Sequence, residues 1–284
     1  MFRPGYAVQA RELTQLQTIL QNQIEQFGRN IYKDGTVISG GEAFFSTGTF
    51  IKLQDTTIDQ DFIDAKVTGL TSGATAVVKK AIDGFTANTT SYASALHITN
   101  TNGIDFVANE QIQIDGTTTT VTVENSTTFK GQTYFVDVAA GIYFVKGNFV
   151  YADAQTVVVS ETFESNPSGI IGYTITESIV TSDDDESLLD PAVGTNNYFA
   201  PGADRYSIDL QLRAFPYDAT VDGSSSTAVT VNEFIRKVQV EFGKVSSYNN
   251  DTQFNAVEDF VAKRTFDQSG DFTVKPFTAL KLVS

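Results

Sequence analysis

The sequence predicts a mainly β protein: one N-terminal amphipathic helix, then an antiparallel, sandwich-like β-scaffold. The chain of 284 residues has 22 Phe, 21 Gly and many Thr and Val, a composition that favours extended structure with frequent tight turns. The clearest helical spacing of apolar residues lies in the N-terminal region. Between residues 63 and 129, short β-like runs alternate with Asp-Gly and Asn-Gly turns, which indicates a small inserted β-barrel or sandwich module.

Residues 1–35 are expected to form a helical anchor. Apolar residues recur there at steps of three and four, which puts them on one helical face: Leu13, Leu16, Leu20, Ile24, Phe27 and Ile31. The opposite face carries Gln15, Gln17, Gln21, Gln26 and Arg29. Glycine costs about 1 kcal/mol relative to alanine inside a helix, so we expect Gly28 to weaken the last turn. The helix should therefore end between Gly28 and Gly35.

The six apolar residues, called the stripe below, are the candidate contact site. A lone helix of this length is marginal in water, so something must cover the stripe. The chain's own β-structure and other copies of the helix are both compatible with the spacing. The heptad pattern slips from Gln23 to Ile24. A short bundle, or packing against a neighbouring protein, is therefore as compatible as a trimeric coiled coil.

The β-scaffold is expected in residues 36–62 and 130–284, with residues 63–129 as the inserted domain. Residues 36–39 and 42–53 are expected to pair as a hairpin across Gly40-Gly41. Later strands are predicted at residues 134–136, 141–145, 147–150, 156–159, 169–180, 206–212 and 234–242. Asp251 is a candidate cap for a second helix with a stripe of Phe254, Val257 and Val261, and residues 218–227 read as an exposed loop.

Net charge limits the partners. The chain has 34 acidic and 19 basic residues and a formal net charge of −15, which argues against binding to nucleic acid or to anionic membranes. There is no cysteine. No apolar run approaches the roughly 20 residues of a membrane span, and the N-terminus lacks the apolar core of a signal peptide. We expect synthesis in a cytoplasm without export by that route.

The residue types present do not indicate a catalytic site. His97 is the one histidine, and no Gly-x-Ser-x-Gly motif accompanies it, so an ordinary surface or partly buried histidine is the expectation. The acidic run 183–186 could bind calcium, but a solvated loop is favoured. Asp59, Asp61 and Asp64 lack the glycine of a calcium loop. We therefore expect no catalytic residue, no cofactor and no metal.

Several motifs resemble a known family. Residues 2–17 (FRPGYAVQARELTQLQ) are followed by Gln23-Ile24, by Lys33-Asp34-Gly35 and by Gly40-Gly41. Further motifs are residues 143–147 (YFVKG), 190–192 (DPA), 200–205 (APGADR) and 262–274 (AKRTFDQSGDFTV). Together they resemble a family of tailed-bacteriophage virion proteins, and residues 69–76 (GLTSGATA) are similar to small β-modules of phage tail and fibre proteins. Members of that family usually extend beyond both ends of this sequence, so we expect a short member or part of a longer protein.

The resemblance implies a non-enzymatic virion structural protein, a component of the baseplate or of the tail-fibre attachment. It would be made in the host cytoplasm and located in the virion. Its expected partners are other phage tail, baseplate and fibre proteins, and a homo-oligomer is expected, with a trimer favoured and a dimer possible. The first alternative is a host receptor-binding tail protein that uses the insert and the 218–227 loop. A polysaccharide-degrading tail enzyme ranks third.

Overall fold

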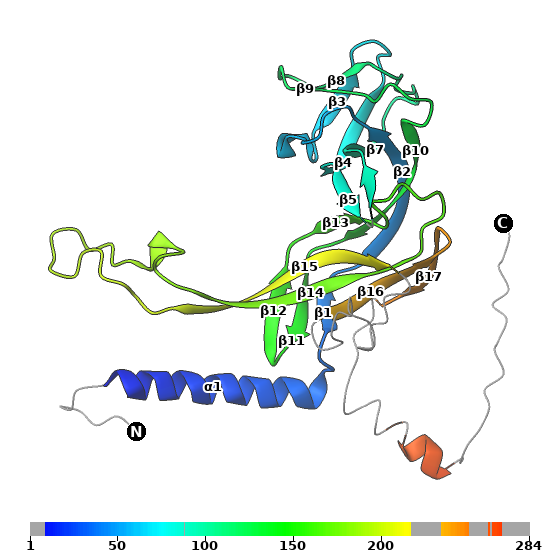
Figure 1. The fold of residues 1–284 in the computed structure, drawn as a ribbon. Helices are drawn as coiled ribbons and strands as arrows, with labels where there is room; N and C mark the ends of the chain where they lie inside the picture. The colour runs from blue at the N-terminus through cyan, green and yellow to red at the C-terminus, as the bar shows by residue number, and fades with distance from the viewer. Residues whose placement is uncertain (1–8, 88, 217–233, 250–260, 262, 269–284) are drawn as a thin grey trace. The chain divides into compact units, whose positions relative to one another are not determined.

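The computed structural model describes residues 9–87, 89–216, 234–249, 261 and 263–268. The fold is mainly β, with helix α1 (Ala10–Ile31) followed by antiparallel sheets, as the sequence predicts (Figure 1). The chain divides into two compact units. One comprises residues 1–36, 144–149 and 252–284, and the other comprises residues 37–143 and 150–251.

The strands and the two short 3₁₀ helices follow α1 along the chain. The first group is β1 (Thr36–Gly40), β2 (Ala43–Lys52), η1 (Gln60–Phe62), β3 (Lys66–Gly69), β4 (Thr75–Ile82), β5 (Phe85–Ala87), β6 (Thr90–Tyr92), β7 (Ala95–Asn100), β8 (Gln111–Ile114) and β9 (Thr120–Thr122). The second group is β10 (Lys130–Val138), β11 (Gly141–Val145), β12 (Asn148–Ala152), β13 (Gln155–Val158), β14 (Gly169–Val180), η2 (Glu186–Leu188), β15 (Arg205–Pro216), β16 (Phe234–Glu241) and β17 (Lys244–Tyr248).

The strands of the described residues form four sheets. The largest has eight strands in the order β13-β10-β2-β7-β4-β3-β8-β9, so most strands of residues 63–129 share a sheet with β2 and β10. A four-stranded sheet has the order β15-β14-β16-β17, a three-stranded sheet the order β1-β11-β12, and β5 and β6 form a hairpin of their own.

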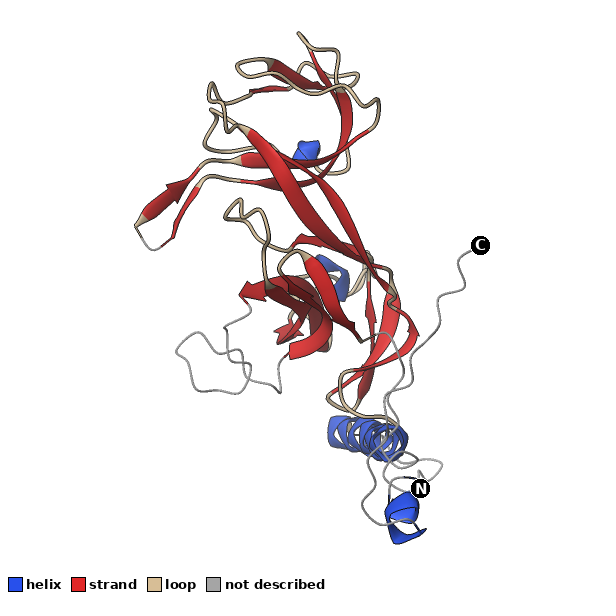
Figure 2. Cartoon of the chain, turned by 90° about the vertical axis from the view of Figure 1, so that its right-hand side faces the viewer, coloured by secondary structure: helices blue, strands red, loops and turns tan. Residues whose placement is uncertain are grey.

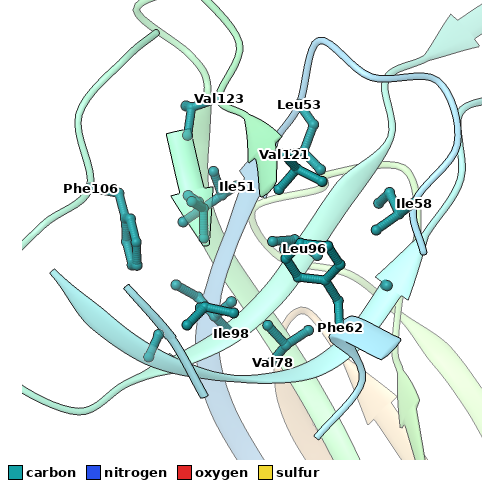
Figure 3. Close-up of a cluster of buried hydrophobic side chains, with 14 of the residues drawn as sticks. Ile51, Leu53, Ile58, Phe62, Val78, Leu96, Ile98, Phe106, Val121 and Val123 are labelled. Carbon is teal, nitrogen blue, oxygen red and sulfur yellow. The ribbon is translucent and has the colours of Figure 1, made fainter. Parts of the chain in front are cut away.

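The eight-stranded sheet curls into a half-barrel around an apolar core (Figure 2). Figure 3 shows side chains from β2, β4, β7 and β9 meeting η1 and the loops inside the curl. Ile51, Phe62, Leu96 and Ile98 are among the fully buried members. Alternate residues of each strand face this core, because successive side chains of a strand point to opposite faces.

Most of the expected strands are confirmed, and two match residue for residue: β11 and β14. The expected hairpin of residues 36–39 with 42–53 is wrong, because β1 pairs with β11 while β2 pairs with β10 and β7. A Gly-Gly turn allows the two flanking strands to pair as a hairpin, but it does not prevent either strand from pairing with one that is distant in the sequence. The 218–227 loop and the Phe254–Val257 part of the second expected helix lie outside the described residues; residues 261 and 263–268 are helical.

Gly48, in the middle of β2, allows the closest approach in this sheet. A Cβ atom there would lie 2.4 Å from the carbonyl oxygen of Ile98 and 2.4 Å from the Phe135 ring. The carbonyl belongs to the backbone of β7, so it cannot move aside without disturbing the pairing of β2 with β7.

We predict that Gly48→Ala destabilises the protein by about 2–4 kcal/mol, because overpacking against a backbone atom cannot be relieved by a side-chain rotation. Chemical unfolding followed by circular dichroism measures the change. Gly84→Ala is the control, since a Cβ atom there meets its nearest neighbour only at 3.3 Å. Equal effects of the two substitutions would contradict this account of β2.

Candidate functional site

Helix α1 has defined ends. At its start, the backbone N–H of Gln9 donates to Oε2 of Glu12 at 2.9 Å, which satisfies one of the free N–H groups of a helix terminus. At its end, the N–H of Tyr32 donates to the carbonyl of Gly28 at 2.8 Å, and Gly35 takes a positive φ of 83°. The helix runs through Gly28 and ends at Ile31, within the range expected from the sequence.

The C-terminal part of α1 packs on the turn between β11 and β12, which belongs to the same unit. The N–H of Gly35 donates to the carbonyl of Phe144 at 2.7 Å, and Oδ1 of Asp34 accepts from the N–H of Lys146 at 2.6 Å. A Cβ atom at Gly28 would lie 2.2 Å from Cε2 of Phe144. Gly28 therefore weakens the helix locally but lets the Phe144 ring reach the helix backbone.

The stripe lies to one side of this packed surface. Successive residues of a helix are about 100° apart around its axis. Gly28 therefore lies about 80° from the centre of the stripe. Glu25, whose side chain lies against Gly147, is about 140° from that centre. Five stripe residues are between 44% and 66% exposed: Leu13, Leu16, Leu20, Ile24 and Phe27. Ile31 is half-buried at the helix end. Ile19 is also exposed at 47%, and the stripe predicted from the sequence did not include it because it falls outside the i, i+3, i+4 pattern.

The helix is electrically neutral although the chain is acidic. Its charged residues are Arg11 and Arg29 against Glu12 and Glu25, whereas the chain carries −15. Arg29 and Glu25 form an ion pair of 2.8 Å at i, i+4. The stripe is therefore an apolar surface with a mostly uncharged, glutamine-containing rim. Such a surface suits burial against another protein and lacks the net charge that would repel a second copy.

The acidic run 183–186 is explained by local structure. Oδ2 of Asp184 accepts from the backbone and hydroxyl of Thr181, and Oδ1 of Asp185 accepts from the N–H of Ser187. These hydrogen bonds hold the pKa of both carboxyls below its usual range. Within the described ranges, no group of three or more His, Cys, Asp or Glu residues could hold a metal ion.

A cleft of about 530 Å³ lies on the larger unit. Its charged lining residues are Lys80, Glu161, Glu164 and Arg213, and Phe85 and Phe215 are among its apolar ones. The hydroxyl of Thr162 donates to Oε1 of Glu164 at 2.9 Å. The cleft offers charged and apolar contacts to a ligand.

His97 on β7 is only 1% exposed, so the expectation of a surface or partly buried residue is wrong. Its Nδ1 lies 2.9 Å from the Thr133 hydroxyl, its ring stacks on Phe163, and its Nε2 has no hydrogen-bond partner within the described chain. Burial, aided by the positive charge of Lys80, lowers the pKa of His97 to about 4. The side chain is therefore neutral at pH 7.

Lys237 on β16 is a buried cation that sequence reasoning missed. A β-bulge between β14 and β16 leaves Lys237 without a cross-strand partner: Ile171 opposes Val238 and Gly172 opposes Arg236. Lys237 is 0% exposed and its Nζ has no hydrogen-bond partner among the described residues. Nζ lies 5.4 Å from the Tyr143 ring centroid, and burial lowers the Lys237 pKa to about 8.

The bulge explains why Lys237 points inward, since an extra residue shifts the alternation of a strand. Ile235 and Val238 are both buried although an odd and an even position should face opposite sides. The signal available in the sequence was the presence of apolar residues at both an odd and an even position of this strand, 235 and 238.

A family model described as "Domain of unknown function (DUF4815)" matches residues 85–284, which is more than half of the chain. The chain belongs to the DUF4815 family. No curated protein and no solved structure shows a match. The match to DUF4815 includes His97 and Lys237 but begins after helix α1. No helix in the described part of this DUF4815 chain combines the length and apolarity needed to cross a bilayer.

We predict that the DUF4815 chain loses stability as the pH falls from 6.5 to about 4. The unfolded state binds a proton at His97 in this window and the folded state does not, so acidification favours unfolding, by up to about 3 kcal/mol. His97→Phe should remove this component. Thermal midpoints of both proteins across the window test it, and parallel pH curves would contradict it.

We predict that Lys237→Met stabilises the protein at pH 7 by about 1–3 kcal/mol, because methionine fills similar volume without an unpaired buried charge. Below the folded pKa of about 8 the advantage is complete. Between about pH 8 and pH 10.5, Lys237 is protonated in the unfolded state and neutral in the folded state. The wild type therefore gains stability as the pH rises through this range, and the stability gap between the variant and the wild type closes. Denaturant titrations at pH 7 and above pH 10 measure the gap. A gap independent of pH would show that Lys237 is uncharged or solvated.

Proposed function

We propose that this chain is a non-enzymatic structural subunit of a tailed-phage virion, a baseplate or tail-fibre-attachment component that docks on its neighbours through helix α1. The observation that carries the proposal is the stripe. Five of its six apolar side chains are exposed, and the described contacts of the helix with the β11–β12 turn use a different side. The sequence motifs that resemble phage virion proteins supply the setting.

The proposed contact is between copies of the chain, with a trimer favoured and a dimer possible. Neutral helices can meet without bringing the acidic charge of the rest of the chain into the contact. Burial of several leucine-sized side chains supplies the free energy, at about 1.5–3 kcal/mol for each side chain fully covered. Other tail, baseplate or fibre proteins are the proposed further partners in the particle.

We predict that the full chain is an oligomer in solution and that the triple variant Leu16→Gln, Leu20→Gln, Phe27→Gln weakens its association by about 100-fold or more, since each truncated interface contact costs about 1–2 kcal/mol. Sedimentation velocity over a concentration series measures the change. The control variant Gln15→Ala, Asn22→Ala, Gln26→Ala alters exposed positions on the other side of α1 and should leave association unchanged.

A monomeric wild type at all concentrations would contradict association through the stripe. Circular dichroism confirms that the triple variant keeps its β-structure, which does not depend on exposed helix side chains. Mass spectrometry of purified particles of the encoding phage tests the setting separately, because a structural subunit must be present in them.

A further inference from the structure

A second surface lies on the hairpin formed by β14 and β15, far from α1 in the sequence. All 12 residues of β14 pair with β15, but β16 pairs only with Gly169–Thr174. The outer half, residues 175–180 and 205–210, therefore has no third strand within the described chain. We call this outer half, with its tip loop 181–204, the β14–β15 arm; Figure 1 shows it running out from the sheet.

One face of the arm continues the apolar core outward. Tyr173 opposes Leu212, and both are buried; Ile175 opposes Leu210; Ile179 opposes Tyr206. These pairs lie on the same face, because every second residue of a strand does. Glu177, opposite Ile208, lies on this face between them, and its Oε2 accepts from the Tyr206 hydroxyl. At the outer end Ile179 is 65% exposed and Tyr206 is 52% exposed. A two-stranded ribbon of this kind is marginal on its own, and covering its apolar face would stabilise it.

The tip loop makes backbone hydrogen bonds of its own. The N–H of Phe199 donates to the carbonyl of Asp190 at 3.1 Å, and the N–H of Asp190 donates to the carbonyl of Ala200 at 3.0 Å. Phe199 adopts a positive φ of 61°, a conformation that is costly for a bulky residue. The loop nevertheless leaves Val193 79% exposed, together with Tyr198 and Phe199. Preorganised apolar side chains of this type favour binding, because little ordering is needed when a partner arrives.

The charge around this apolar face selects the kind of partner. Residues 177–209 contain one basic residue, Arg205, and eight acidic ones: Glu177, Asp183, Asp184, Asp185, Glu186, Asp190, Asp204 and Asp209. A second copy of the chain would bring the same negative charge and be repelled, as would nucleic acid or an anionic membrane. Only a basic surface complements the acidic residues of the arm, and only an apolar one covers Ile179 and Tyr206.

We propose that the β14–β15 arm is a docking arm for a different protein, one whose contact surface is an apolar groove edged by lysine and arginine. The apolar face enters the groove, and the carboxylates at its rim meet the cationic edge. The arm is independent of the stripe, so the proposal stands or falls separately from association through α1.

Binding of the full-length chain to model peptides tests the arm. The probes are fluorescent peptides of alternating Leu and Lys, alternating Leu and Glu, and alternating Thr and Lys, read by fluorescence anisotropy. We expect the Leu–Lys peptide to bind, with added salt weakening it, the Thr–Lys peptide to bind about tenfold more weakly, and the Leu–Glu peptide not to bind. Equal affinity for the Leu–Lys and Thr–Lys peptides would overturn the proposal, since charge alone would then explain binding.

Two variants locate the binding. Ile179→Thr with Tyr206→Thr should weaken Leu–Lys binding about tenfold, whereas Phe44→Thr, which removes an exposed aromatic side chain from β2, should not. Asp183→Asn with Glu186→Gln removes two exposed carboxylates without touching the apolar face, and should weaken binding and reduce its salt dependence. This second variant serves as the test if the first does not fold.

Unchanged peptide binding in both variants would overturn the assignment to the arm. A loss of self-association in the Ile179→Thr, Tyr206→Thr variant, seen by sedimentation, would instead show a second copy as the occupant and would also overturn it. Neither result affects the expected loss of association in the stripe variant, so failure of one proposal is distinguishable from failure of the other.

Discussion

The contact between Gly28 and Phe144 sets one side of helix α1 against the turn between β11 and β12. A side chain at position 28 would overlap the aromatic ring, so the ring reaches the helix only because glycine is there. Tyr32 and Phe149 pack beside the Phe144 ring, and the centroids of the Tyr32 and Phe149 rings are 6.2 Å apart. The hydrogen bonds of Asp34 and Gly35 to the β11–β12 segment fix the direction of the chain at the end of the helix. The stripe lies about 80° around the helix from Gly28. Five of its six side chains are exposed.

The two proposed contact surfaces differ in charge, and this difference separates their partners. The stripe lies on a neutral helix, so copies of it can approach one another. The β14–β15 arm carries eight of the 34 acidic residues, so it favours a basic neighbour over a second copy. A protein with both surfaces can associate with itself at one and with a different protein at the other, which is what a connecting subunit of an assembly needs. Neither surface depends on the buried His97 or Lys237.

Much of the fold could be predicted from the sequence, because the spacing that marks a helix or a strand involves only residues close together in the chain. The helix with the range of its end, and the strands β11 and β14, follow from the spacing of apolar residues and from glycine turns. The pairing of β1 with β11 could not be predicted, since it joins segments about 100 residues apart and no pattern within one strand names its partner. For the same reason the sequence did not show that most strands of residues 63–129 share a sheet with β2 and β10.

For the candidate sites, too, the sequence predicted what depends on local spacing and missed what depends on contacts between distant segments. The stripe was predictable from spacing, but its exposure was not, because periodicity cannot say what covers an apolar face. His97 was expected near the surface because its alternating context resembles a half-exposed strand, whereas β7 lies inside the eight-stranded sheet. The β14–β15 arm was missed since its strand pattern is ordinary, and no pattern within β14 shows that its described pairing with β16 stops at Thr174.

The absence of cysteine from the chain makes one measurement direct. A single-cysteine variant, Leu20→Cys, places the sole thiol of the protein in the stripe, and Asn22→Cys places it on the other side of the same helix turn. If copies meet through the stripe, Leu20→Cys forms disulfide-linked dimers on mild oxidation and is protected from maleimide, while Asn22→Cys is labelled freely. Free labelling of both variants, without disulfide-linked dimers at position 20, would contradict the account.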